Sequence, residues 1–241
     1  MLCGGNVRRV LTEFADVIGV FIPELLPAVG FDQHSPFHSH DVWQHTVHAV
    51  AAAEAKLNVR LALFFHDLSK PACFTRDATG RGHFYSHPKK SAALARTVMA
   101  RLAFPKAQID QVSLLILHHD SHAAKEDEVK WLLNAVGEES FPQLIQVMRA
   151  DILAHGRWTI PRRLAALDAL ARTGEKILEN GDCYSLRDLA LTGDDLAERG
   201  FSGKQIGEGL EIALKNVISG KWKNERETLL SELAKIFPKT R

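Results

Sequence analysis

The chain has 241 residues, of which 46% are hydrophobic and 24% charged, and its formal net charge is +1 at pH 7. Its length suits one large domain or two small ones, and its charge excludes attraction to nucleic acid or a membrane by a bulk field. Three widely separated cysteines exclude a CxxC-type zinc site and favour a reducing, cytoplasmic location. The apolar stretch 17–31 is broken by a glutamate and two prolines, so no membrane span is predicted. No signal peptide is recognisable.

The positions of the histidines are the most informative feature of the composition. All twelve lie between His34 and His155, and the last 86 residues contain none. Histidines that merely covered the surface would be expected along the whole chain. Their clustering indicates a metal site or an acid–base centre in the middle of the sequence.

The first forty residues are expected to form a helix, a break and a loop. Apolar residues at helical spacing predict a helix from Val7 to Ile18, and the prolines within residues 22–27 interrupt it. Residues 30–40 are polar and rich in histidine, which predicts a loop. Within this loop, His38 and His40 either line the mouth of a pocket or are simply solvated.

Asp41 is placed to N-cap a second helix, which runs through residues 42–53. His45 and His48 lie three residues apart in this helix, so they are near one another on one face. One of them can therefore point into the core while the other lies at its edge.

The apolar run 59–65 ends abruptly in His66 and Asp67. A buried helix that ends in adjacent imidazole and carboxylate groups costs free energy unless both are paired or bind a cation. Capping of neighbouring helix ends by these two side chains is the simpler explanation for one such pair. However, a second apolar helix, 109–117, runs into His-His-Asp at 118–120. Capping explains the pattern less easily when it occurs twice.

The segments around this second helix complete the middle of the chain. Residues 75–82 are polar and predict a turn or loop, and residues 91–102 predict a helix. A later helix, 141–155, carries Asp151 among apolar residues. Arg149 faces another side of that helix, so the partner of Asp151 is expected elsewhere in the fold. A metal ion and an arginine from another helix both meet this requirement.

The C-terminal third is predicted to be helical throughout. Ser202 and Asn224 are expected to cap its last two helices, and the predicted helices cover residues 161–179, 185–190, 193–199, 204–218 and 225–237. The chain lacks the period-two alternation of a sheet, and it contains no internal repeat. The predicted fold class is therefore all-α, a helical bundle followed by a helical tail.

Polar residues that fall at apolar helix positions form one candidate site. Its members are His45, His66, Asp67 and Asp151, with His87 and His119 as further candidates. This mixed nitrogen and oxygen set suits a divalent first-row metal, namely Mn²⁺, Fe²⁺, Co²⁺, Ni²⁺ or Zn²⁺. Such an ion lowers the pKa of bound water and polarises a phosphoryl oxygen. The expected reaction class is hydrolysis of a phosphate ester.

The order His45, His66-Asp67 and a distant Asp151 in an all-helical chain resembles the HD-domain superfamily of metal-dependent phosphohydrolases. This resemblance implies an HD-domain helical bundle in which these four residues bind a metal. It also implies that the substrate is a nucleotide, a cyclic phosphodiester or a phosphate at an RNA end.

The resemblance extends to further residues. His87 and His119 match the two additional histidines of two-metal members, so one or two ions are expected. Lys70 would reach a substrate phosphate, and Asp67 and Lys70 are the expected catalytic residues.

Several segments resemble the C-terminal part of bacterial CCA-adding tRNA nucleotidyltransferases that carry an HD domain. They are residues 31–33, 36–38, 41–46, 191–196 and 217–225. In that family similar tail helices hold the tRNA. The resemblance therefore implies a tRNA partner for the tail, where Lys204, Gln205 and free backbone amides at a helix start could bind an RNA phosphate.

The resemblance divides the chain into an N-terminal helical segment (1–30), an HD domain (31–160) and a tRNA-binding-like tail (161–241). The Gly-Ser loop and Asp-x-Asp pair of nucleotidyl transfer are absent from the sequence, so the chain is not expected to add CCA by itself. It is either a stand-alone protein or the C-terminal fragment of a larger enzyme. A phosphohydrolase, a non-catalytic RNA-binding module and a nucleotide-sensing domain all fit. The complete set of motif residues favours the phosphohydrolase.

Overall fold

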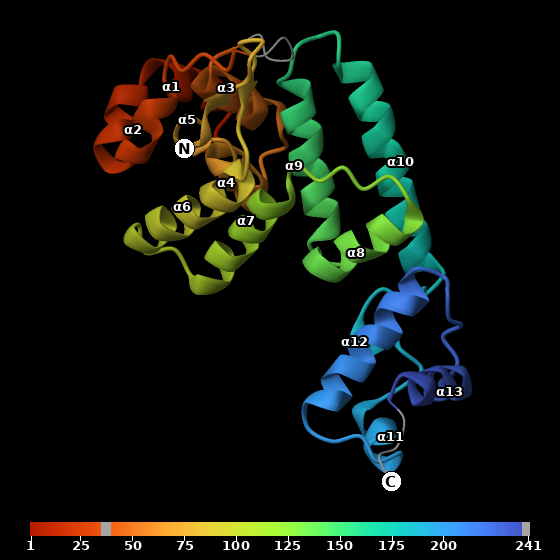
Figure 1. The fold of residues 1–241 in the computed structure, drawn as a ribbon. Coiled ribbons are helices and arrows are strands. Elements are labelled where there is room, and N and C mark those ends of the chain that lie inside the picture. Colours follow the sequence, from red (N-terminus) through yellow and green to blue (C-terminus); the bar gives the residue numbers. More distant parts are fainter. Residues whose placement is uncertain (35–39, 238–241) are drawn as a thin grey trace. The chain divides into compact units, whose positions relative to one another are not determined.

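The computed structural model describes residues 1–34 and 40–237 and divides into two compact units (Figure 1). Unit 1 comprises residues 1–122 and 138–169, and unit 2 comprises residues 123–137 and 170–241. The described residues are mostly helical, which confirms the predicted all-α class. The division into segments 1–30, 31–160 and 161–241 stays a prediction.

The helices follow one another along the chain with short connections. Unit 1 contains α1 (Val7–Glu13), α2 (Ala15–Phe21), the 3₁₀ helix η1 (Pro23–Ala28), α3 (Val42–Ala52), α4 (Leu57–Phe65), α5 (Lys70–Cys73), α6 (His87–Arg101), α7 (Lys106–His118) and α9 (Phe141–Leu153). Unit 2 contains α8 (Glu126–Val136), the 3₁₀ helix η2 (Leu186–Asp188), α11 (Gly193–Glu198), α12 (Lys204–Ile218) and α13 (Arg226–Ile236). Helix α10 (Ile160–Glu179) begins in unit 1 and ends in unit 2.

Helix α4 lies at the centre of unit 1 and packs against α3, α6, α7 and α9. Every residue from Val59 to Phe65 is buried, as expected for a helix that is apolar on all sides. Arg60 is the polar member of this run. Its guanidinium donates to the backbone oxygens of Leu2, Ala53 and Glu54, which compensates the burial of its charge.

Helix boundaries in unit 1 agree with the sequence in some places and differ in others. The predicted cap is confirmed, because the Asp41 carboxylate accepts a 2.7 Å hydrogen bond from the Gln44 amide. The single helix predicted from Val7 to Ile18 is instead two helices, separated at Phe14, where φ is −122° and ψ is 29°. The helix predicted to begin at residue 91 begins at His87. The proline at the second helical position is compatible with this earlier start, because backbone nitrogens in the first turn have no hydrogen-bond partner within the helix.

The polar segment after α5 forms a small antiparallel hairpin. Strands β1 (Thr75–Arg76) and β2 (Gly82–His83) pair with Thr75 opposite His83. Two-residue strands are too short to show an alternating pattern, so the sequence predicted only a loop. Gly82 is required by a close approach, since a Cβ there would lie 2.4 Å from the backbone oxygen of Gln33.

Unit 2 has an apolar core of its own, drawn largely from leucines of α11, α12 and α13. Two predicted caps are wrong. Gly203, with φ +53°, and not Ser202, precedes α12, and no side-chain hydrogen bond caps this end. Asn224 does not cap α13; its side chain links the backbone of Asp188 and Ala190. Gly181, with φ +66°, follows the end of α10 as predicted.

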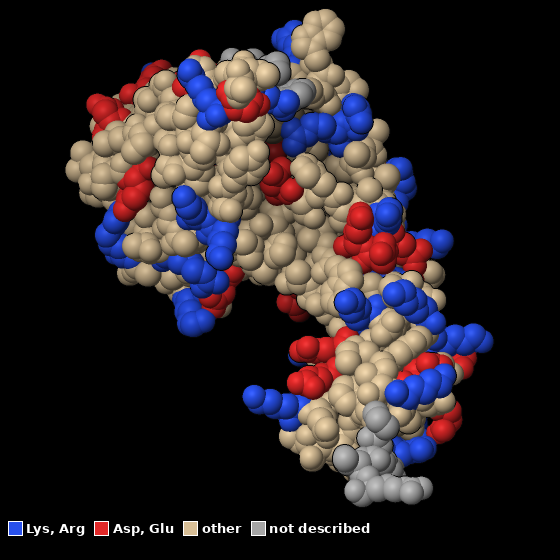
Figure 2. Space-filling view, in the orientation of Figure 1, with Lys and Arg blue, Asp and Glu red and all other residues tan. Residues whose placement is uncertain are grey.

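Charged side chains of both signs are interspersed on the face in Figure 2, in small groups of each kind. This distribution agrees with the formal net charge of +1. Among the described residues, none of the helices combines the length and the apolar character needed to cross a membrane.

Candidate metal centre

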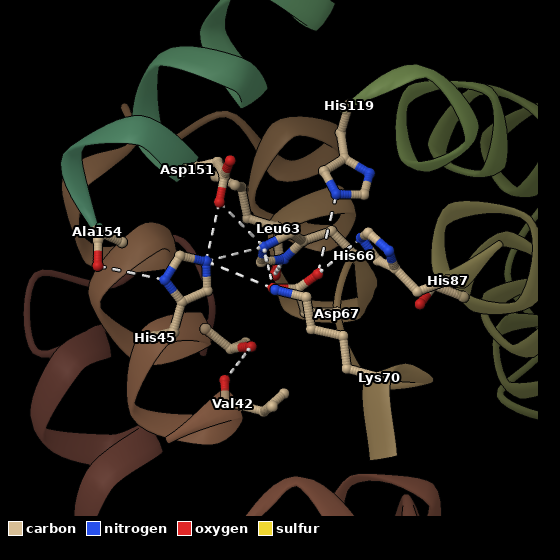
Figure 3. A network of polar contacts seen from close by, with 12 residues as sticks. Val42, His45, Leu63, His66, Asp67, Lys70, His87, His119, Asp151 and Ala154 are labelled. Carbon is tan, nitrogen blue, oxygen red and sulfur yellow. Dashed lines mark hydrogen bonds and ion pairs between the residues drawn. The ribbon is translucent and has the colours of Figure 1, made fainter. Parts of the chain in front are cut away.

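Four predicted ligands meet between three helices of unit 1 (Figure 3). His45 comes from α3, His66 and Asp67 follow the end of α4, and Asp151 lies on α9. The Nε2 atom of His45 lies 2.9 Å from Asp151 Oδ1 and 3.3 Å from His66 Nε2. The Nε2 atom of His66 lies 3.2 Å from Asp67 Oδ2 and 3.4 Å from Asp151 Oδ1. All four side chains are buried, so the two imidazoles and the two carboxylates face one another in a site that is shielded from bulk water.

The two additional histidines face the other oxygen of Asp67. His87 begins α6 and His119 follows α7, and both are buried. Their Nε2 atoms lie 3.3 and 3.9 Å from Asp67 Oδ1. The carboxylate of Asp67 therefore lies between two groups of ligand atoms, with Oδ2 toward His45 and His66 and Oδ1 toward His87 and His119.

Backbone carbonyls fix the orientation of all four rings. The Nδ1 atoms lie within 3.2 Å of carbonyl oxygens, which belong to Ala154 for His45, Leu63 for His66, Phe84 for His87 and Ile116 for His119. A carbonyl can only accept, so each Nδ1 carries the proton and donates it. Each Nε2 then presents its lone pair to the centre whenever the ring is neutral.

Capping of a neighbouring helix end explains the position of His66 but does not explain that of Asp67. His66 follows α4 and donates from Nδ1 to Leu63 at 2.7 Å, which satisfies a carbonyl of the last turn. The next helix, α5, is preceded by Ser69 without any side-chain cap. Asp67 is 1% exposed, and neither of its oxygens accepts a well-directed hydrogen bond.

Burial and charge act against each other in this centre. Burial opposes the charged form of His66, but Asp67 and Asp151 outweigh it and raise its pKa to about 10. Burial also opposes the ionised form of Asp67, yet the charges of His66 and Lys70 hold its pKa well below the ordinary value. His119 behaves differently, because burial dominates and lowers its pKa to about 4. A protonated His66 thus supplies positive charge between two carboxylates.

Lys70 completes the surroundings of Asp67. It is 6% exposed, and its Nζ lies 2.7 Å from Asp67 Oδ2. The Nζ also donates to Gln33 Oε1 at 2.9 Å, and Gln33 Nε2 donates to the backbone oxygen of His40 at 3.2 Å. Gln33 therefore holds the lysine beside the ligand cluster, a role that sequence analysis did not identify.

The residues present fit a divalent metal ion. Both oxygens of Asp67 are buried without a directed donor, and three groups of ligand atoms in this cluster, each with members within 4.8 Å of one another, could hold an ion. Neutral Nε2 atoms and carboxylate oxygens are ligands that first-row divalent metals accept. A divalent ion would replace the positive charge that His66 supplies in the metal-free protein.

His155 is a neighbour of the cluster that was not among the predicted ligands. It lies one turn after Asp151, and its Nδ1 is 2.8 Å from the Asp151 backbone oxygen. Its ring packs edge-on to His45, and burial lowers its pKa to about 4. The i, i+4 spacing from Asp151 was the available signal. His48 instead stacks on His40, and His38 lies outside the described residues.

Asp151 contacts a histidine of the cluster and, more distantly, an arginine from another helix, which is one of the two partners that the sequence allowed. Its main contact is His45, and Arg163 Nη2 lies more distantly at 3.9 Å from Oδ2. Arg149 faces elsewhere, as predicted, and pairs with Asp168 at 2.6 Å.

The cluster lies at the floor of a cleft of about 860 Å³ within unit 1. Asp67, Lys70, His87, His119 and Asp151 line it together with residues 81–86, 158, 159, 162, 163 and 166. Arg81 and Gly82, at the end of the segment predicted as a turn or loop, thus line this cleft.

The two residues predicted to bind RNA lie in unit 2. Lys204 and Gln205 are exposed at the start of α12. The amide of Gln205 donates to Ser202 and that of Ile206 to Gly203. These two amides are therefore engaged, contrary to the expectation of free donors at this helix start.

Residues 38–156 match the family model of the HD domain. The chain carries an HD domain. The match contains every member of the buried histidine and aspartate cluster, so the resemblance inferred from the residue order is confirmed.

Distant relatives of the HD-domain chain are tRNA nucleotidyltransferases. It is 30% identical to the CC-adding tRNA nucleotidyltransferase of Thermus thermophilus over 88% of this chain and 48% of that protein. It is 31% identical to the A-adding tRNA nucleotidyltransferase of Deinococcus radiodurans over 60% of this chain and 35% of that protein. The Multifunctional CCA protein of Azoarcus is 31% identical over 70% of this chain and 39% of that protein. The chain spans about half the length, or less, of these relatives.

Proposed function

We propose that the HD domain is a metal-dependent phosphohydrolase that acts on a nucleotide, a cyclic phosphodiester or a phosphate at an RNA end. The observation that carries the proposal is the convergence of four imidazole Nε2 atoms and two carboxylates in one buried cluster at the floor of a cleft. A purely structural cluster would not need every Nδ1 to be tied to a carbonyl so that every Nε2 points inward.

The cluster is proposed to hold two ions. His45, His66, Asp67 and Asp151 would hold one, and His87 and His119 would hold the other with Asp67 shared between them. Bound divalent ions supply an activated water near neutral pH and a Lewis acid for a phosphoryl oxygen. The candidates are Mn²⁺, Fe²⁺, Co²⁺, Ni²⁺ and Zn²⁺, because all of them accept this ligand set.

The protein's own groups have distinct tasks in this proposal. Asp67 fixes the spacing of the two ligand groups, because it contributes an oxygen to each. Lys70, held by Gln33, presents an ammonium group at the cleft floor and binds a non-bridging phosphate oxygen. The carbonyls that accept from each Nδ1 keep the rings in place, which limits reorganisation during the reaction.

A matched pair of variants on α3 tests the proposal. His45 lies in the cluster and His48, one turn later, lies outside it. Elemental mass spectrometry of untagged protein should find about two equivalents of transition metal in the wild type and in His48→Gln, with a large loss in His45→Gln. Hydrolysis of p-nitrophenyl phosphate, bis(p-nitrophenyl) phosphate and 2′,3′-cyclic nucleotides should follow the metal content. Wild-type protein that neither contains nor takes up Mn²⁺, Co²⁺ or Ni²⁺ would overturn the proposal.

A second candidate is a non-catalytic RNA-binding module, equivalent to the C-terminal fragment of a CCA-adding enzyme. It is favoured by the extent of the similarity, because the Thermus thermophilus match covers 88% of the chain whereas the HD match ends at residue 156. The similarity therefore extends into unit 2. This candidate requires salt-dependent tRNA binding that persists in Asp67→Ala, together with no hydrolysis by the metal-loaded wild type.

A further inference from the structure

The cleft above the cluster has two walls that the proposed hydrolysis does not by itself require. One wall is the segment 81–88, which includes β2, and the other is the segment 155–166, which includes the start of α10. Both belong to unit 1. Each wall combines an exposed aromatic side chain with arginine, and Asp67, Lys70 and Asp151 line the same cleft.

The aromatic side chains of the first wall are held in a fixed orientation. The rings of His83 and Tyr85 are parallel within 1°, with centroids 5.5 Å apart. His83 Nε2 lies 2.8 Å from Asp77 Oδ2, and Asp77 Oδ1 accepts from Thr79 and from the amide of Arg81. The hairpin turn thus holds the His83 ring, and the His83 ring supports Tyr85. Tyr85 is nevertheless 71% exposed, so much of its surface remains available to a ligand.

The second wall carries Trp158, which is 97% exposed. A single exposed apolar side chain is ordinary on a protein surface. Here, however, the indole lines the same cleft as Tyr85 and is followed by Arg162 and Arg163. Arg163 reaches to 3.9 Å from Asp151, and the preceding residue, Arg162, is exposed. This wall therefore carries two cationic groups, one of them close to the cluster.

We propose that this cleft receives the end of a single-stranded nucleic acid, with its terminal phosphate at the cluster. Bases near the end stack on Tyr85 and Trp158, and the phosphates that follow contact Arg81 and Arg162. This inference rests on the proposed function and names its substrate class. A mononucleotide offers one base, whereas the cleft offers aromatic faces on two walls. Aromatic faces beside arginines are the usual means of holding single strands without reading their sequence.

Binding measurements in the presence of a chelator test the inference without hydrolysis. The probe is a hexaribonucleotide with fluorescein at one end and a phosphate at the other, followed by fluorescence anisotropy. Tyr85→Ala and Trp158→Ala should each raise the dissociation constant roughly 5- to 150-fold, as expected for loss of one base stack. Trp158→Phe should restore most of the affinity, and Arg162→Ala should reduce the dependence of binding on salt.

Two controls match these variants. Trp131 is an exposed tryptophan of α8 in unit 2, at 41% exposure, and Arg172 is an exposed arginine farther along α10. Trp131→Ala and Arg172→Ala should bind the probe like the wild type. Affinity that is unchanged in both Tyr85→Ala and Trp158→Ala would overturn the inference. The inference would also be overturned if adenosine monophosphate displaced the probe at the same concentration as the unlabelled hexamer does. That result would show that a mononucleotide fills the site.

The outcome separates the inference from the proposed function. Aromatic-dependent oligonucleotide binding by a protein that hydrolyses no phosphate ester would support the inference and remove the phosphohydrolase. Alternatively, the protein could hydrolyse bis(p-nitrophenyl) phosphate while its affinity for the oligonucleotide does not depend on Tyr85 and Trp158. That outcome would retain the phosphohydrolase and overturn the inference.

Discussion

Asp67 in unit 1 and Asp195 in unit 2 are both aspartates beside a cation, yet they differ in what holds them. Asp195 accepts from the amide and hydroxyl of Thr192 and pairs with Arg226 at 2.6 Å, on the surface at the start of α11. Asp67 is buried and pairs with Lys70 at 2.7 Å, without a directed hydrogen bond. Local structure therefore accounts for Asp195, whereas Asp67 has a requirement that a cation within the cluster would meet.

Removing the buried carboxylate should have the largest effect. In metal-free protein, Asp67→Ala leaves the charges of His66 and Lys70 buried without their partner, which should cost about 3–5 kcal/mol of stability. With metal present, the same change removes the shared ligand, so metal content and hydrolysis should both be lost. Thermal unfolding in a chelator and elemental analysis measure the two effects.

The matched control for Asp67 is Asp120, which follows the second apolar helix in the same sequence context. Its side chain is 42% exposed and pairs loosely with His122 at 3.6 Å. Asp120→Ala should therefore change stability by less than about 0.5 kcal/mol and leave the metal content intact. Equal losses in Asp67→Ala and Asp120→Ala would show that burial is not what distinguishes these two aspartates.

The next effect concerns His119, the residue before Asp120. Its Nε2 faces Asp67 Oδ1, away from the group that contains His45. His119→Gln should therefore lower the metal content from about two equivalents to about one, while Asp151→Asn should reduce the occupancy of the other ion. Elemental analysis after equilibration with a fixed free concentration of Mn²⁺ measures both. A wild-type content of one equivalent that His119→Gln leaves unchanged would contradict the assignment of two ions.

Sequence analysis identified the polar residues at the ends of these helices, but it did not identify which of them are buried in the fold. Apolar runs that end in histidine and aspartate were visible, and so was the lone Asp151, because each is a local departure from a periodic pattern. Burial was not visible: Asp67 and Asp120 look alike in the sequence, and only the packing of α3, α6, α7 and α9 around α4 distinguishes them.

Contacts between distant segments account for most of what sequence analysis missed. Gln33 holds Lys70 across 37 residues, and Gly82 accommodates the backbone of that same glutamine. Neither contact produces a periodic pattern in the sequence. The wrong caps at Ser202 and Asn224 have a similar origin, because a residue's capping tendency was outweighed by a glycine in one case and by a contact to η2 in the other.

Gln33 gives a smaller but more specific effect. Gln33→Leu removes the acceptor that holds Lys70 and should cost about 1–3 kcal/mol of stability through the unsatisfied donor. Because Lys70 is proposed to bind the phosphate, the KM for bis(p-nitrophenyl) phosphate should rise with metal content unchanged. Gln33→Glu keeps an acceptor and should restore part of the affinity. A fall in metal content in Gln33→Leu would mean that Gln33 supports the ligands and not the lysine.

The smallest effect is expected at Asp195, and it should appear only in acid. The side chain and amide of Thr192, with Arg226, lower the pKa of Asp195 to about 2. A folded-state pKa below the ordinary value of 3.8 stabilises the fold above pH 4, and this contribution is lost as the pH falls toward 2. Asp195→Asn cannot titrate, so the difference in unfolding temperature between wild type and variant should narrow over this interval. Parallel curves from pH 5 to pH 2 would show that the capping carboxylate does not stabilise unit 2 through its charge. Asp195 would then not be a valid surface comparison for the charged, buried Asp67.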